Sequence, residues 1–260
     1  MEIAAYLDAL DEDGVALADA AERAGLAAPV PTCPGWAVRD LVRHQAYVHG
    51  WAARHVRDQL PEIIDEGTEA EALAAGPPDG ELIAAYRHGH AALLAVLREA
   101  SPEVACATFM PAPSPLAFWA RRQAHETAVH RFDAQGAVPG SPPDPVTAFG
   151  AAFAADGIDE LIMGFAARRR YRLRGDGARS LAIRPSDAPD CWQVRLSDGV
   201  TTVSRVEPRA AAAAACVLAG PAAGLYAFLW NRCPASDARV TVTGDPAVAA
   251  LWASSVCVTW

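Results

Sequence analysis

The hydrophobic and polar positions in the first half of the chain repeat with the period of an amphipathic α-helix in four long segments. In one of them, leucine, alanine and tyrosine recur at near-helical spacing between Leu82 and Leu97. Clusters of proline and glycine separate the segments, and such residues end one helix and prepare the next. The pattern therefore predicts four helices, at about 3–26, 38–60, 81–100 and 119–134.

The second half has a different pattern, which begins after the proline- and glycine-rich segment 136–145. A further helix is expected at about 146–169. Short, partly alternating runs then predict three antiparallel strands, at 181–184, 191–196 and 201–206. The alanine-rich run 210–218 fits either a helix or a strand.

The last fifty residues predict three more elements. A helix is expected at 224–232 and a strand at 239–243. A final helix should open at Asp245-Pro246, because proline fits the first helical turn.

These elements predict an α+β protein with two domains. Residues 1–136 are interpreted as a metal-binding four-helix bundle, whose long loops favour at least one crossover connection. Residues 146–260 are interpreted as a smaller C-terminal α+β domain with helices layered on a sheet.

Composition and charge narrow the classes of function. With 260 residues, 52% of them hydrophobic and 20% charged, the chain should fold around a sizeable core. Its net charge of −9 argues against nucleic acid or an anionic membrane as a partner. No apolar run reaches the roughly 18 residues of a membrane span, and the acidic N-terminal stretch does not resemble a signal peptide. We therefore expect a cytoplasmic, monomeric protein, in which the six scattered cysteines are free thiols.

One pair of side chains indicates metal chemistry. Glu126 and His130 are four residues apart on one predicted helix, so they lie on the same face and can hold one metal ion together. His125 cannot join His130 from that face, because residues five apart are rotated by about 140°. The spacing therefore excludes the His-Glu-x-x-His motif of metalloproteases. By itself, such a Glu-His pair is more often a surface ion pair.

A third ligand would come from the second predicted helix. His44 is one candidate, and His49 and His55 compete with it on the same helix. Spacing alone does not choose among the three. Two imidazole nitrogens and one carboxylate oxygen form the ligand set of an open, catalytic zinc site.

Two stretches carry a family resemblance. The segments PTCPGWAVRDLVRH at 31–44 and AHETAVHR at 124–131 resemble the mycothiol-dependent maleylpyruvate isomerase family, which belongs to the wider DinB-like metal-binding bundles. The segments 220–232 and 240–245 resemble the C-terminal domain of that family, which is related to sterol carrier proteins. The resemblance thus implies a DinB-like four-helix bundle followed by a smaller sterol-carrier-like α/β domain.

The resemblance also implies a metal site and a cosubstrate. The ligands of the family fall on His44, Glu126 and His130, which selects His44 over His49. The implied metal is zinc or another divalent ion, since these ligands also suit nickel, iron or manganese. Mycothiol is the implied thiol cosubstrate. Arg232 matches an arginine near the family's metal site and is suited to hold a carboxylate, although a cation at a helix C-terminus is an equal alternative.

The implied activity is addition of a metal-activated thiolate to a small electrophile, which can bear a carboxylate. In an isomerase the thiolate would leave again after rotation about the new single bond, whereas in an S-transferase it would stay attached. Two alternatives remain: a metal-dependent enzyme that does not use the thiol, and a non-enzymatic metal- and ligand-binding protein. A fourth protein ligand such as His49 would favour the last, because structural zinc normally has four.

Overall fold

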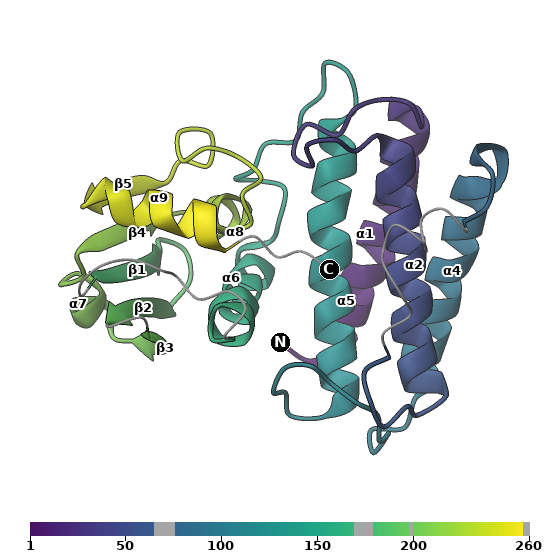
Figure 1. The fold of residues 1–260 in the computed structure, drawn as a ribbon, viewed down its shortest axis with the longest axis horizontal. Helices are drawn as coiled ribbons and strands as arrows, with labels where there is room; N and C mark the ends of the chain where they lie inside the picture. The colour runs from purple at the N-terminus through teal and green to yellow at the C-terminus, as the bar shows by residue number, and fades with distance from the viewer. Residues whose placement is uncertain (65–75, 169–178, 198–199, 257–260) are drawn as a thin grey trace. The chain divides into compact units, whose positions relative to one another are not determined.

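The computed structural model of the chain describes residues 1–64, 76–168, 179–197 and 200–256 (Figure 1). The chain divides into two compact units, Met1–Pro143 and Asp144–Trp260. The first unit is helical, and the second combines helices with a sheet, so the predicted α+β class is confirmed.

The first unit contains the four predicted helices, which lie side by side in Figure 1. They are α1 (Ile3–Ala24), α2 (Val38–Arg57), α4 (Asp79–Glu99) and α5 (Pro115–Gly136). The start predicted for α5 was four residues too late. The Ser114 hydroxyl accepts a hydrogen bond from the backbone N–H of Ala117 at 3.2 Å, and Pro115 occupies the first helical position, where no N–H is needed.

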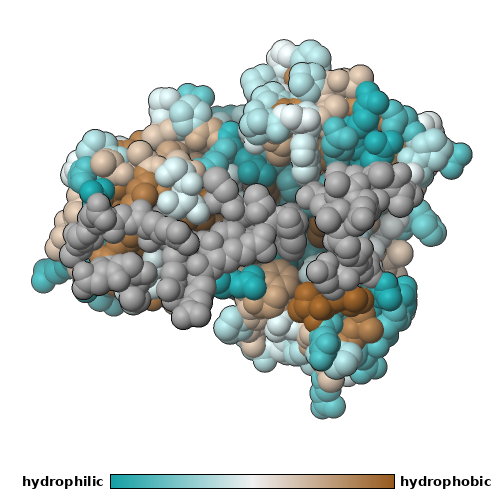
Figure 2. Space-filling view, viewed as in Figure 1, coloured by the Kyte–Doolittle hydropathy of each residue, from teal (hydrophilic) through white to brown (hydrophobic). Residues whose placement is uncertain are grey.

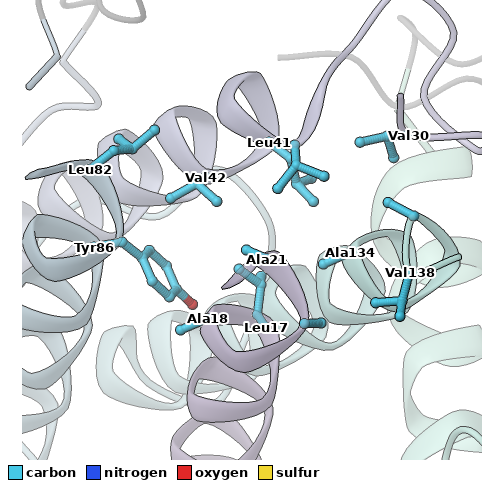
Figure 3. Close-up of a cluster of buried hydrophobic side chains, with 13 residues drawn as sticks. Leu17, Ala18, Ala21, Val30, Leu41, Val42, Leu82, Tyr86, Ala134 and Val138 are labelled. Atoms are coloured by element: carbon cyan, nitrogen blue, oxygen red, sulfur yellow. The ribbon is translucent and has the colours of Figure 1, made fainter. Parts of the chain in front are cut away.

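The core of this unit lies where α1, α2, α4 and α5 meet (Figure 3). Leu17 and Ala21 of α1 pack there with Leu41 of α2 and Leu82 of α4. Helix α5 differs from the others because polar as well as apolar side chains are buried along most of its length. A buried helix that carries arginine, glutamate, histidine and aspartate must satisfy these groups inside the protein, and such a polar cluster is typical of a functional site.

The second unit is built on a five-stranded sheet with the order β3-β2-β1-β4-β5. The strands are β1 (Arg179–Pro185), β2 (Cys191–Ser197), β3 (Val200–Val206), β4 (Cys216–Gly220) and β5 (Thr241–Gly244). The first three strands form the predicted antiparallel ladder. β4 pairs in parallel with β1, and β5 pairs antiparallel with β4. The ambiguous alanine-rich run contains both structures, since a short helix α7 (Pro208–Ala211) precedes β4.

The remaining helices of this unit are α6 (Ala151–Asp159), the π-helix η1 (Glu160–Ala166), α8 (Ala222–Leu229) and α9 (Pro246–Ser255). The helix predicted at 146–169 therefore begins later, after Gly150, and its second half is π-helical; Arg169 lies outside the described residues.

The cysteines and the surface agree with the composition. None of the described cysteines forms a disulfide bond; they are Cys33, Cys106, Cys191, Cys216 and Cys233. Cys257 lies outside the described residues. Hydrophobic residues visible in Figure 2 form small patches between hydrophilic ones. Among the helices that the structure describes, none combines the length and the apolar character that a membrane span requires.

Candidate metal centre

The structure brings together the three side chains that the resemblance selects. His44, Glu126 and His130 each offer one ligand atom, and these atoms lie within 4.8 Å of one another. Glu126 Oε1 is 3.1 Å from His44 Nε2 and 3.3 Å from His130 Nε2. All three side chains are buried. Two nitrogens and one oxygen therefore converge in the interior of the bundle.

Two helices position these side chains. Glu126 and His130 are one turn apart on α5, as their spacing predicts, and His44 comes from α2, which packs against α5. The start of α2 is fixed by Asp40, whose Oδ2 accepts a hydrogen bond from the backbone N–H of Ala37 at 2.9 Å.

The two carboxylate oxygens of Glu126 have different partners. Oε1 faces the two histidines and is also 3.5 Å from Nε2 of Gln45, whereas Oε2 accepts a hydrogen bond from Arg122 Nη2 at 3.0 Å. Burial by itself would raise the pKa of Glu126. Hydrogen bonds with His130 and His44, and the charges of His130 and Arg122, outweigh burial and hold this pKa well below its ordinary value. The side chain is therefore an ionised acceptor with Oε1 directed at the histidines.

His130 has a carboxylate at each ring nitrogen. Its Nε2 faces Glu126, and its Nδ1 is 2.9 Å from Oδ2 of Asp133. Cys33, His130 and Asp133 consequently form a second group of potential ligand atoms within 4.8 Å. The two groups share His130, so a metal at one group leaves the other ring nitrogen for a hydrogen bond.

Trp36 lies against both histidine ligands. Its ring centroid is 5.2 Å from that of His44 and 6.3 Å from that of His130, with the latter rings stacked at 18°. The indole is half-buried and belongs to the loop between α1 and α2. It supplies an apolar side to an otherwise polar group.

The competing histidines have other partners. His49 Nε2 lies 2.9 Å from Thr127 Oγ1, and His55 Nδ1 lies 2.8 Å from the carbonyl oxygen of Trp51. His125 packs edge-on to the ring of Tyr6. Within the described residues, no fourth His, Cys, Asp or Glu joins His44, Glu126 and His130. This three-membered set matches an open site better than a closed structural one.

Arg232 belongs to the second unit. It follows α8, and its Nη1 donates a hydrogen bond to the carbonyl oxygen of Trp230 at 2.8 Å. This contact is the one expected of a cation near a helix C-terminus. The catalytic role of Arg232 stays a prediction.

The sequence places Arg122 on the metal-binding helix but leaves its direction open, and it indicates no role for Asp133 or Gln45. Arg122 and Asp133 lie four residues before Glu126 and three residues after His130, so each shares a helix face with a ligand candidate. Their signal was available, since α5 carries charged residues where an amphipathic helix would place apolar ones.

Two family models match the chain. The family model described as the mycothiol maleylpyruvate isomerase N-terminal domain matches residues 7–135, and the one described as the MDMPI C-terminal domain matches residues 152–251. No curated protein has a significantly similar sequence.

Two crystal structures share the fold. One is a mycothiol-dependent maleylpyruvate isomerase, with 15% sequence identity, a TM-score of 0.63, and coverage of 94% of this chain and 93% of the other. The second is a mutant of a mycothiol-dependent maleylpyruvate isomerase with one histidine replaced by alanine, at 14% identity and the same TM-score and coverage. Since the N-terminal and C-terminal domain models together span most of its length, the chain belongs to the mycothiol maleylpyruvate isomerase family.

Proposed function

We propose that this chain is an enzyme that holds a divalent metal on His44, Glu126 and His130 and uses it with mycothiol to act on a small electrophile. Membership of an enzyme family named for a mycothiol-dependent isomerisation supports the thiol and the reaction class. The single observation that carries the metal is the buried convergence of these three side chains from two helices.

The donor set fits a divalent ion. Two Nε2 atoms face the same carboxylate oxygen at 3.1 and 3.3 Å, and a cation among them would replace these close contacts by coordination bonds. Two imidazoles and one carboxylate form the ligand set of open catalytic zinc sites, and nickel, iron and manganese also accept such ligands. We propose zinc as the native metal.

A metal with an open position lowers the pKa of a thiol that binds there, which provides a thiolate at neutral pH. The protein residues prepare this environment. Arg122 neutralises the charge of Glu126 from the far side, so the carboxylate does not cancel the charge of the cation. Trp36 covers the imidazole rings and keeps water from that side of the group.

Isomerisation by reversible addition of the thiolate to an activated double bond is the reaction we favour, with S-transfer as the second candidate. Both begin with the same carbon–sulfur bond, and the same residues would serve either. If the substrate bears a carboxylate, Arg232 is our candidate to bind it. Comparison of Arg232→Ala with Arg232→Lys tests this role: we expect a large rise in KM that lysine partly restores, and unchanged kinetics would remove the role.

The metal is tested by elemental analysis of the purified protein and three variants. We expect about one zinc per chain in the wild type, and its loss in His44→Ala and Glu126→Gln while circular dichroism shows an intact fold. Glutamine is chosen because it keeps an oxygen that can accept from the buried Arg122. His49→Gln is the matched control, because His49 is a buried histidine of the same helix whose Nε2 faces Thr127. Retention of zinc by His44→Ala would contradict the ligand assignment.

The thiol is tested on the metal-loaded protein. Isomerisation of maleylpyruvate, followed by absorbance with and without mycothiol, should require the thiol. Activity without mycothiol would favour a thiol-independent enzyme. Metal-loaded protein that turns over neither maleylpyruvate nor a panel of other electrophiles would favour a binding protein.

A further inference from the structure

We propose that Asp133 is a positioning residue of the metal site, which keeps the proton of His130 on Nδ1 and so presents the Nε2 lone pair to the metal. The effect on metal binding rests on the proposed function, whereas the position of the proton on His130 can be measured without any metal.

The helix places Asp133 beside His130. The two residues are three positions apart on α5 and therefore share a face. Asp133 Oδ2 is 2.9 Å from His130 Nδ1, and the Asp133 side chain is fully buried. The opposite nitrogen of the same ring, Nε2, is 3.3 Å from Glu126 Oε1. The imidazole is thus held between two carboxylates of one helix, each at a different nitrogen.

The chemistry of imidazole assigns different roles to these carboxylates. A neutral ring carries one N–H and one lone pair, and only the nitrogen with the lone pair can bind a metal. To bind a metal with the other ligand candidates, Nε2 must carry the lone pair, which leaves the proton to Nδ1. Asp133 is the acceptor of that proton. A hydrogen bond of this kind fixes the tautomer and the ring orientation and raises the basicity of the ligand.

Asp133 also has two partners in the loop between α1 and α2. The Thr32 hydroxyl donates to its Oδ1 at 2.6 Å, and the Cys33 thiol lies 3.5 Å from its Oδ2. These donors stabilise a buried carboxylate, which would otherwise be costly to desolvate. They also hold Asp133 in place independently of His130.

The same loop presents Trp36 to the ligand histidines. Its turn is closed by hydrogen bonds from the Val30 N–H to the Trp36 carbonyl at 2.9 Å and from the Trp36 N–H to the Cys33 carbonyl at 3.0 Å. Asp133 therefore joins the ring of His130 to the loop whose indole stacks on that ring. Its position is set from both sides, as expected of a residue that orients a ligand.

The group Cys33, His130 and Asp133 could alternatively bind a metal of its own. If His44 and Glu126 held a second metal ion, both nitrogens of His130 would have to lose their protons and bridge the two ions. The positioning role requires only one metal and an ordinary neutral imidazole, and we therefore favour it.

The first experiment measures the tautomer of His130 in metal-free protein. Imidazole ¹⁵N chemical shifts are recorded on ¹⁵N-histidine-labelled wild type, Asp133→Ala, Asp133→Asn and Thr32→Val, with His130→Gln used to assign the signals. We expect a proton on Nδ1 in the wild type and in Thr32→Val, whether or not Glu126 also holds one on Nε2, and its loss from Nδ1 in Asp133→Ala. A wild-type ring protonated on Nε2 alone would overturn the proposal even if no Asp133 variant folds.

The second experiment measures zinc affinity of the same proteins by competition with a chromogenic chelator. Loss of a hydrogen bond to a metal-bound histidine typically weakens binding by about 10–100-fold, and we expect this for Asp133→Ala. Asp133→Asn keeps an oxygen that can accept from Nδ1 and loses only the charge, so we expect a smaller decrease. Thr32→Val keeps the carboxylate but removes one of the donors that hold it, so its affinity should fall less than that of Asp133→Ala. An affinity of Asp133→Ala equal to the wild type would overturn the proposal, as would two zinc ions per wild-type chain. Wild type that binds no zinc but shows the Nδ1 proton would refute the proposed function alone.

Discussion

The ion pair between Arg122 and Glu126 provides a sharp test of the electrostatics of the site. Arg122 is fully buried and Glu126 is 3% exposed, and Nη2 lies 3.0 Å from Oε2. Arg122→Met keeps much of the side-chain volume and removes the charge, which leaves a buried carboxylate without its cation. Removing one partner of a buried ion pair costs about 3–5 kcal/mol. In metal-free protein we therefore expect a thermal midpoint lower by about 10 °C.

The loss of stability in Arg122→Met should depend on whether the metal is bound. A zinc ion at Oε1 would neutralise Glu126 in the variant, and it would no longer be repelled by the guanidinium. Zinc should therefore raise the thermal midpoint of Arg122→Met more than that of the wild type. By linkage, each 1.4 kcal/mol or so of unfolding free energy that zinc adds to the variant beyond its effect on the wild type corresponds to about tenfold tighter zinc binding by the variant.

The assay is thermal unfolding followed by circular dichroism, with EDTA and with excess zinc. Arg131→Met is the matched control, because Arg131 is another buried arginine of α5 whose Nε donates to Asp13 at 2.8 Å, away from the ligand candidates. It should lose stability by an amount that zinc does not change. The reasoning would be refuted if zinc raised the midpoint of Arg122→Met no more than that of the wild type.

Three further predictions concern stability. Burial lowers the pKa of His49 well below its ordinary value, so below about pH 6.5 the unfolded chain binds a proton that the native protein does not. The free energy of unfolding should therefore fall by up to about 1.4 kcal/mol per pH unit as the pH decreases. In urea unfolding of metal-free protein, His49→Gln should lose less stability between pH 7 and 5 than the wild type. Gly14→Ala should lower the free energy of unfolding by about 1–3 kcal/mol, because a Cβ there would overlap the ring of His90. Gly89→Ala meets open space and should raise it by about 0.5–1 kcal/mol. Equal thermal midpoints of the two variants in calorimetry would contradict this packing. Asn231→Ala should lose about 1–2 kcal/mol in the same measurement, since its φ of 59° is left-handed and its amide donates to the carbonyl oxygens of Ala253 and Val256; Asn231→Gly should restore only the backbone part.

The helices could be predicted because their signals are local. Periodicity and proline-rich loops predicted α1, α2, α4 and α5, with errors of a few residues at their ends. The pairing of Glu126 with His130 followed from helix geometry alone. The choice of His44 over His49 did not, because both side chains reach α5, His44 at Glu126 and His49 at Thr127. Which of them meets the Glu-His pair depends on how α2 and α5 are placed against each other, and spacing within one helix carries no such information.

Other features required tertiary contacts. The alanine-rich run 210–218 ends as a strand because Cys216 pairs with Leu181 of β1, whereas its local composition favours a helix. The π-helix η1 has no recognised sequence signal that separates it from the α-helix it continues. Two of the partners of Asp133, Thr32 and Cys33, lie about a hundred residues away in the loop after α1, so they become visible only when the loop and α5 are seen together.

The buried polar residues of α5 have a consequence for how this family can diverge. Arg122, Glu126, His130 and Asp133 satisfy one another in a chain of contacts along one helix. A descendant that abandoned the metal could not simply replace Glu126, because a buried guanidinium would be stranded. We expect such lineages to exchange Arg122 and Glu126 together for apolar residues, and to release Asp133 from selection when His130 is lost. Substitutions on α5 should therefore be inherited in sets, so that a relative with only one of these positions changed would be a transitional, poorly stable form.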